Sequence, residues 1–274
     1  MDRSMVNGFV YVATGEKYLK EAELSAKSLR NCSPGAKICL ITDEVYESSA
    51  FDEIRLIPFD EITEQSWKAN LVYKVLGIIN TPFEHTIFVD TDMYFVHPVD
   101  DLFKLLDHFD ILACLDYYDQ SKINYNNSNM PHYTPYNTGM LVYRQNNEVS
   151  RFLKSWKECY EKNLDIYWSD QPAFMEALIT HNIKMYILHS SFNFRFLFNV
   201  GFLENEKVRI IHGRATEDEL KIIAERVNAT LDQRVWVASL RKCFTWESNL
   251  RDRILRKIYQ MIPAPIKKFY RRIR

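Results

Sequence analysis

Apolar runs alternate with helical periods along the first 115 residues, and this alternation predicts an α/β fold. Between the runs, apolar residues recur every three or four positions, which predicts a helix that Thr14 caps and a second helix over residues 66–79. This order indicates a mostly parallel sheet covered by helices on both faces. The apolar runs, typical of buried strands, are residues 9–13, 37–42, 54–57 and 86–89.

The later chain continues with shorter elements after a long irregular stretch. Residues 117–136 are rich in Tyr, Asn and Ser without any period, which is typical of a functional lid or a mobile segment. We find no internal repeat, so we predict one domain over residues 1–250, with a nucleotide-binding half (about 1–115) and an acceptor half (about 116–250). The predicted strands here are 137–144, 183–188 and 208–211, and the predicted helices are 148–160, 169–180 and 217–227.

The composition fits one large globular domain. The 274 residues are 47% hydrophobic, and no run of about 18 apolar residues is long enough to predict a membrane span. The N-terminus lacks the long apolar stretch of a secretory signal, so we predict a cytoplasmic protein. Its five cysteines are scattered and form no Cys-x-x-Cys pair, which favours reduced thiols over disulfides or a zinc site.

Charge is distributed unevenly. Residues 251–274 contain nine Lys or Arg and one Asp, so the first 250 residues carry a net charge of −9. The acidic body argues against nucleic acid as a partner. The basic segment mixes cations with apolar residues, which predicts a helical, amphipathic extension that binds an anionic membrane surface. The alternative is that it docks on the acidic body of the protein.

Two aspartates follow the apolar strand 86–89. Asp90 and Asp92 are two positions apart, so on an extended chain their side chains point the same way. The carboxyl edge of an open α/β sheet is where ligands bind. Two carboxylates there suit Mg²⁺ or Mn²⁺ that also carries substrate phosphates. The alternative is a solvated turn.

The stretch from Phe88 to Phe103, with its Asp90-Thr91-Asp92 core, resembles the signature of nucleotide-sugar glycosyltransferases of the GT-A fold. The likeness is to the glycogenin-like enzymes and the bacterial lipopolysaccharide galactosyl- and glucosyltransferases. It implies transfer of a hexose, most simply from a UDP-sugar, to a glycan or glycolipid acceptor with retention of configuration. It also implies Mn²⁺ or Mg²⁺ as cofactor.

Further residues follow in that family's order, and the resemblance gives each a role. It implies Asp90, Asp92 and His212 as metal ligands, Asp170 and Gln171 at the reacting sugar, and contacts to the nucleotide sugar from other residues. Those other residues are Tyr11, Thr14, Lys74, Thr91, Asn137, Gly139, Gly213 and Arg214. Asn193 and Arg195 are weaker candidates, because the aromatic residues around them are typical of a core.

Ordinary structural interpretations stay open for several of these residues. Tyr11 fits a core position, Lys74 a solvated helix position, and Asp170 with Gln171 a helix cap. Arg214 departs from the family's late motif, which usually continues toward Lys-Pro-Trp. This departure leaves the donor geometry open.

Three other function classes are alternatives to a glycosyltransferase. Haloacid-dehalogenase-like phosphatases also use Asp-x-Asp, but their fourth following residue is Thr or Val, whereas here it is Tyr94. Sugar nucleotidyltransferases carry a glycine-rich basic loop after the first strand, and the sequence has none there. A non-catalytic nucleotide- or sugar-binding protein remains an alternative.

Overall fold

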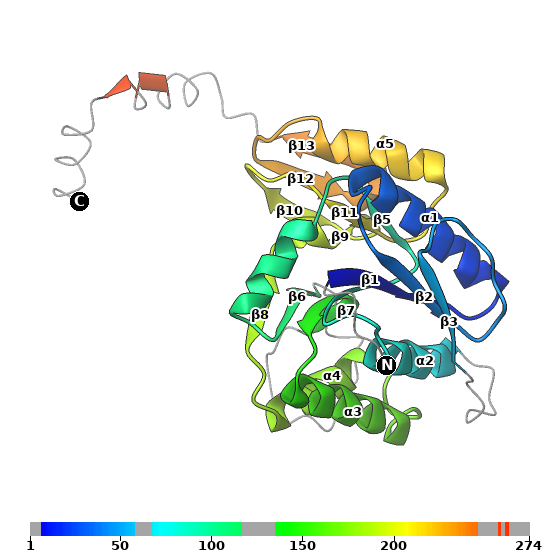
Figure 1. Ribbon diagram of the computed structural model, residues 1–274. Coiled ribbons are helices and arrows are strands. Elements are labelled where there is room, and N and C mark those ends of the chain that lie inside the picture. The colour runs from blue at the N-terminus through cyan, green and yellow to red at the C-terminus, as the bar shows by residue number, and fades with distance from the viewer. Residues whose placement is uncertain (1–6, 58–66, 117–134, 246–256, 259–260, 263–274) are drawn as a thin grey trace, which may run out of the picture.

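A seven-stranded sheet forms the centre of the protein in the computed structural model, which describes residues 7–57, 67–116, 135–245, 257–258 and 261–262 (Figure 1). The strand order is β3-β2-β1-β4-β7-β6-β8. β7 runs antiparallel to both of its neighbours, and the other neighbouring pairs are parallel, which confirms a mostly parallel sheet. The strands are β1 (Asn7–Val12), β2 (Ile38–Thr42), β3 (Glu53–Leu56), β4 (His85–Val89), β6 (Ile111–Leu115), β7 (Tyr136–Arg144) and β8 (Met185–Leu188).

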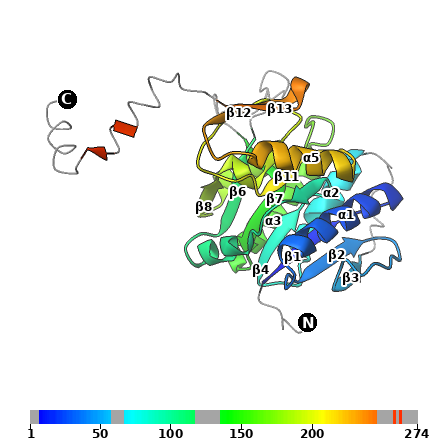
Figure 2. The same cartoon turned by 90° about the horizontal axis from the view of Figure 1, so that it is seen from above.

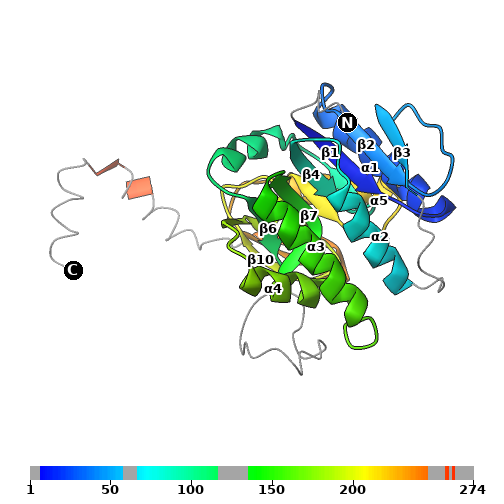
Figure 3. The ribbon, with the colours of Figure 1, turned by 60° about the horizontal axis from the view of Figure 1, so that its bottom comes forward.

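Helices cover both faces of this sheet because its strands are apolar on both sides. On β1, Phe9 packs in the cluster that contains Leu19 of α1 (Glu16–Cys32). The adjacent Val10 points to the other face, where Val75 and Trp156 belong to α2 (Trp67–Ile79) and α3 (Asn147–Lys162). Figure 3 shows α2, α3 and α4 (Gln171–Thr180) lying together across that face. The predicted two-sided cover is therefore confirmed.

A second, smaller part of the fold lies beside α1 and carries two three-stranded sheets and a helix (Figures 1 and 2). Their shared core contains Phe194, Ile211, Leu220 and Trp236. In one sheet, β11 pairs antiparallel with β5, which places His212 opposite Met93. The elements are β5 (Met93–Phe95), β9 (Phe194–Arg195), β10 (Val200–Leu203), β11 (Ile210–His212), β12 (Arg234–Val237), β13 (Lys242–Thr245) and α5 (Glu217–Asn228).

One predicted helix boundary was wrong. α1 begins at Glu16 with Gly15 at the capping position, and Thr14 does not cap it. Instead, the Thr14 hydroxyl donates to Oδ1 of Asn70 on α2, 3.3 Å away. Thr14 is thus a link between the first strand and α2.

Two predictions concern residues that the structure describes little or not at all. Residues 117–134, most of the predicted lid, lie outside the described residues, as does most of the basic segment 251–274. Within the described part of the chain, none of the helices is both long and apolar enough to cross a membrane. Membrane contact and cytoplasmic location therefore stay predictions.

Candidate functional site

The two acids follow β4 at the carboxyl edge of the sheet. The backbone N–H of Asp90 donates to the carbonyl of Gly139 on β7, 2.7 Å away, so Asp90 is still held by the sheet. The chain then turns, and Asp92 directly precedes β5. Because β5 pairs with β11, the second acid lies beside a residue more than a hundred positions later.

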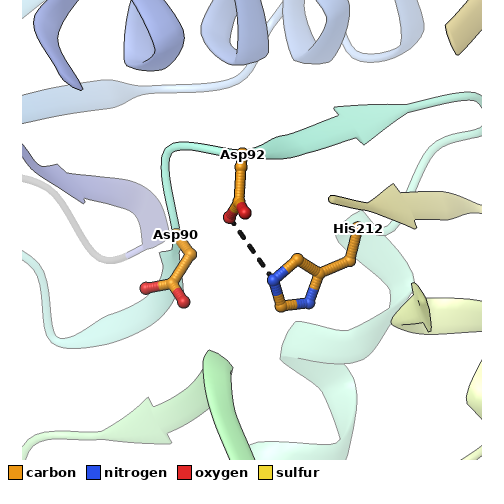
Figure 4. Close-up of side chains that lie close together, drawn as sticks. All are labelled: Asp90, Asp92 and His212. Atoms are coloured by element: carbon orange, nitrogen blue, oxygen red, sulfur yellow. Dashed lines mark ion pairs between the residues drawn. The ribbon is translucent and has the colours of Figure 1, made fainter. Parts of the chain in front are cut away.

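That residue is His212, and it completes a group of three potential metal ligands. Its Nε2 lies 3.3 Å from Oδ1 of Asp92. One ligand atom from each of Asp90, Asp92 and His212 lies within 4.8 Å of the others (Figure 4). Asp90 and Asp92 come from the connection between β4 and β5, His212 comes from β11, and the three side chains point toward a common space (Figure 4).

Two glycines make room around this group. A Cβ on Gly139 would lie 2.8 Å from Oδ2 of Asp90 and 2.9 Å from Cε1 of His212, which is too close for a side chain. Gly213 has a φ of +138°, a conformation that favours glycine, and its N–H donates to the carbonyl of Asp92 at 2.9 Å. At both positions the structure therefore requires glycine.

The donor set fits a divalent cation. Two carboxylates and an imidazole suit Mn²⁺ or Mg²⁺, with the nitrogen favouring Mn²⁺, and three protein ligands leave positions for substrate oxygens. Burial raises the pKa of Asp90, although Lys74 opposes this shift. Burial also acts to raise the pKa of Asp92, but His212 and Arg214 hold it below its ordinary range. The pKa values of the two acids are thus shifted in opposite directions, and a bound cation would stabilise the ionised form of both.

Lys74 joins this group to the reacting-sugar candidate Asp170. Its Nζ lies 3.3 Å from Oδ1 of Asp90 and 3.3 Å from Oδ2 of Asp170. The hydroxyl of Thr138 accepts from Lys74 at 3.2 Å and donates to Asp170 at 2.9 Å. Lys74 is only 7% exposed, so the solvated interpretation is wrong. Burial acts to lower the pKa of Lys74, but the two acids raise it above its ordinary value.

Asp170 does not serve as a side-chain cap, although it precedes α4. Its carboxylate makes no capping hydrogen bond within the described structure and faces Lys74 and Thr138 instead. Its carbonyl accepts from the indole nitrogen of Trp156 at 3.0 Å. Asp170 therefore occupies the N-cap position of α4, as the capping interpretation expects, but its carboxylate faces the site instead of the helix end.

A second polar group centres on Asp116, which the sequence reasoning missed. Asp116 follows β6 and is 3% exposed. Its Oδ2 accepts from Nδ2 of Asn137 at 3.1 Å and from Nε2 of Gln171 at 2.9 Å, and its Oδ1 pairs with Arg195 at 2.6 Å. An acid directly after an apolar run was the available signal, as it was for Asp90.

A cavity of about 430 Å³ opens over the acids. At its exposed side, Nε of Arg214 donates to Glu21 at 3.0 Å, Nη1 lies 3.7 Å from Oδ2 of Asp92, and the guanidinium carbon lies 5.6 Å from the ring centre of Tyr18. Glu21 also accepts from the hydroxyl of Thr91 at 3.1 Å. The lining residues are Val12, Ala13, Thr14, Tyr18, Asn70, Leu71, Lys74, Asp90, Thr91, Asp92, His212 and Arg214.

Tyr11 lies away from this cavity. It is fully buried, and its hydroxyl lies 3.0 Å from Oγ of Ser25 on α1. Burial raises the pKa of its phenol. The structure thus supports the core interpretation of Tyr11. Asn70 and Tyr18 line the cavity, whereas Tyr11 does not. Asn70 lies one helical turn before Lys74, and this spacing is the sequence feature that could have indicated it.

Asn193 and Arg195 contribute polar groups from an otherwise apolar segment. The aromatic neighbours Phe194 and Phe196 are buried, which confirms the core prediction for them. Nδ1 of His212 lies 2.7 Å from Oδ1 of Asn193, and Arg195 pairs with Asp116.

Comparisons with known proteins agree with this fold. A solved structure of an active-site mutant of LgtC has a TM-score of 0.53 at 15% identity, covering 77% of this chain and 88% of that one. Mouse xyloside xylosyltransferase 1 has a TM-score of 0.49 at 12% identity, covering 77% of this chain and 98% of that one. The first shows a shared fold, the GT-A arrangement that the sequence predicts.

Sequence comparison gives the family. Glucoside xylosyltransferase 1 of Gallus gallus is 24% identical in an alignment of 207 positions that covers 64% of this chain. The chain spans 47% of the length of that relative. The family model described as nucleotide-diphospho-sugar transferase matches residues 84–221, half of the chain, including Asp90, Asp92 and His212. The chain therefore belongs to the nucleotide-diphospho-sugar transferase family.

Proposed function

We propose that this protein transfers a hexose or pentose from a UDP-sugar to a glycan or glycolipid acceptor, with retention of configuration and with a divalent cation as cofactor. The observation that carries the proposal is the convergence of Asp90, Asp92 and His212 under a cavity at the carboxyl edge of the sheet. Family membership supplies the reaction class. The pentose is included because a relative is named as a xylosyltransferase.

Asp90, Asp92 and His212 would hold Mn²⁺ or Mg²⁺. When bound, the cation neutralises negative charge on the leaving diphosphate. The chain also brings a cation of its own, because Arg214 lines the cavity and reaches Asp92 through one Nη. Its planar guanidinium suits a diphosphate, and Glu21 holds Nε so that the Nη groups can face the phosphates.

The cavity lining offers groups for a nucleoside, and Lys74 joins this lining to Asp170. Thr14, Asn70 and Tyr18 line the cavity and would offer a nucleoside hydroxyl and amide groups for hydrogen bonds and an aromatic face for the base. The sugar would bind beside Asp90, where Gly139 lets the backbone of β7 lie close to Asp90 and His212. Asp170 lies there with its charge balanced by Lys74, and Gln171 is held by Asp116. This gives Asp170 and Gln171 the sugar-facing role.

The test is UDP release by the full chain with UDP-glucose, UDP-galactose and UDP-xylose, each with Mn²⁺, Mg²⁺ or excess EDTA. We expect one donor to be hydrolysed or transferred only with metal, and Asp92→Asn to reduce the rate by at least a hundredfold. Asp101→Asn is the matched control, since Asp101 is half exposed and pairs with Arg209 outside the cavity. A wild-type rate in Asp92→Asn would refute the metal assignment. Donor binding without UDP release would identify a non-catalytic binder.

A further inference from the structure

A buried hydrogen-bond chain leads away from the far side of the His212 ring. Its Nδ1 lies 2.7 Å from Oδ1 of Asn193, and Nδ2 of Asn193 lies 2.8 Å from Oδ1 of Asn137. Oδ1 of Asn137 also accepts from the backbone N–H of Gly139 at 3.0 Å. Asn193 is 6% exposed and Asn137 is 3% exposed, so water has little access to the chain.

The direction of every bond in this chain follows from one fixed donor. A backbone N–H can only donate, so the atom of Asn137 that faces Gly139 must be its oxygen. The atom of Asn193 that faces this oxygen must then be the amide nitrogen, which leaves the Asn193 oxygen toward His212. An amide oxygen only accepts, so Nδ1 of His212 must carry a proton.

The opposite end of the chain agrees with this assignment. The remaining atom of Asn137 is its amide nitrogen, and it faces Oδ2 of Asp116 at 3.1 Å. Asp116 pairs with Arg195 and so presents a carboxylate acceptor at that point. Both ends therefore require the same orientation of the Asn137 amide, because a reversed amide would place its NH2 group against the N–H of Gly139 and its oxygen against Oδ2 of Asp116.

We infer that Asn193 is a positioning residue that holds the His212 proton on Nδ1 and aims the Nε2 lone pair at the space between Asp90 and Asp92. In a neutral imidazole, a proton on one nitrogen leaves the other as the lone-pair donor that a metal needs. Nε2 lies on the side of Asp92, 3.3 Å from its Oδ1. The inference rests on the proposed metal-dependent function, but it concerns a proton position that exists without metal.

The side chain of Asn193 is not needed for the local backbone turn. Asn193 ends the short 3₁₀ helix Ser190–Phe192 through its backbone N–H, which donates to the carbonyl of Ser190 at 3.1 Å. Its side chain makes the two contacts described above, to His212 and to Asn137. A change of the side chain therefore tests the chain of hydrogen bonds while leaving the turn in place.

The experiment uses the full chain with ¹⁵N-labelled histidine, first without metal and then with Mn²⁺ as probe. Long-range ¹⁵N–¹H correlations report which ring nitrogen of His212 carries the proton, and electron paramagnetic resonance gives the Kd for Mn²⁺. We expect the wild type to be protonated on Nδ1. Asn193→Leu removes the acceptor for Nδ1, so the proton should move toward Nε2, which faces Asp92, and the Kd should rise by about 10–100-fold. Asn193→Ala removes the acceptor without adding bulk and serves if the Leu variant does not fold.

Asn193→Asp separates this role from a general packing role. The aspartate keeps an oxygen toward Nδ1 of His212 but loses the donor toward Asn137, so the Nδ1 tautomer and a Kd within a few-fold of wild type are expected, with a lower Tm. Asn80→Leu is the control, since Asn80 is exposed and its side chain donates to the carbonyl of Leu76 in α2. An unchanged tautomer in the Leu and Ala variants overturns the inference, as does equal loss in the Asp and Leu variants. If the wild type binds no Mn²⁺ but the tautomer shifts as expected in the Leu and Ala variants, the metal proposal fails and the assignment of Asn193 stands.

Discussion

The ammonium of Lys74 lies 3.3 Å from Oδ1 of Asp90, the first acid of the Asp-Thr-Asp segment. The same ammonium also lies 3.3 Å from Oδ2 of Asp170. One buried cation thus balances two acids that would otherwise repel each other across the site. Lys74 therefore contributes both to the stability of the fold and to the charge balance of the cavity that it lines.

Replacing Lys74 by Met should destabilise the protein by about 3 kcal/mol, because removal of one member of a buried ion pair leaves uncompensated charge. The measurement is the free energy of unfolding by urea at pH 7. Lys27→Met is the control, since Lys27 pairs with Glu23 on the exposed side of α1. The loss should shrink as pH falls and the acids take up protons. Equal stability of the two variants would contradict a role for Lys74 in balancing the acids.

Gly139→Ala should weaken metal binding while the overall fold persists. The new Cβ would lie 2.8–2.9 Å from Asp90, Asn137 and His212, so the side chains must move, at a cost of about 1–3 kcal/mol. We expect the Kd for Mn²⁺ to rise at least tenfold, as measured by electron paramagnetic resonance. Gly35→Ala is the matched control, because nothing lies within 4 Å of its added Cβ. A Kd equal to that of the control would show that the cluster does not hold the ion.

Arg214→Lys should raise the KM for the nucleotide sugar about tenfold, with a smaller effect on kcat. Lysine keeps the charge but cannot hold Glu21 through Nε while it reaches a diphosphate through a second nitrogen. Glu21→Gln should have a smaller effect in the same direction. Arg226→Lys, whose side chain bonds a carbonyl outside the cavity, is the control. The prediction fails if KM is unchanged and only kcat falls.

Protonation of Asp110 should lower the free energy of unfolding in acid. Asp110 accepts from Arg144, from Asn146 and from the backbone N–H of Lys184, and so joins β7 to the segment before β8. Although burial acts to raise the pKa of Asp110, the hydrogen bonds and Arg144 lower it. A group with a lowered folded pKa stabilises the protein above its unfolded pKa, near 3.9, and this stability is lost as pH falls through the folded value.

The free energy of unfolding, measured from pH 7 to pH 3, should therefore fall less steeply in Asp110→Asn than in the wild type. The variant should also be less stable at pH 7, by about 1–3 kcal/mol, because an amide cannot accept all these hydrogen bonds. Asp107→Asn, at the exposed end of a 3₁₀ helix, is the control. Parallel pH profiles for wild type and Asp110→Asn would rule out this role.

The sequence predicts the long elements well, because their periods are strong. α2, α3 and β4 lie within a few residues of their predicted bounds. The short strands escaped prediction: β9 has two residues, and it exists because β11 lies beside it. No local pattern encodes a pairing whose partner is supplied by the tertiary fold.

At the site, the sequence predicts the ends of strands better than the direction of side chains. Asp90 and Asp92 were found from an apolar run, but Tyr11 was placed at the nucleotide although it faces α1 and bonds Ser25. The alternation along β1 does not reveal which layer of helices each side meets. Asp116 was missed because a single acid after a strand is common, and its partners lie on three other elements.

β7 separates the two polar networks. Successive residues of this strand point to opposite faces, so Asn137 serves the chain to His212, whereas Thr138 serves Lys74 and Asp170. A one-residue deletion between positions 135 and 139 would exchange these faces and dismantle both networks in one step. In a scan of single-codon insertions and deletions, this short segment should therefore tolerate length changes far less than it tolerates conservative substitutions.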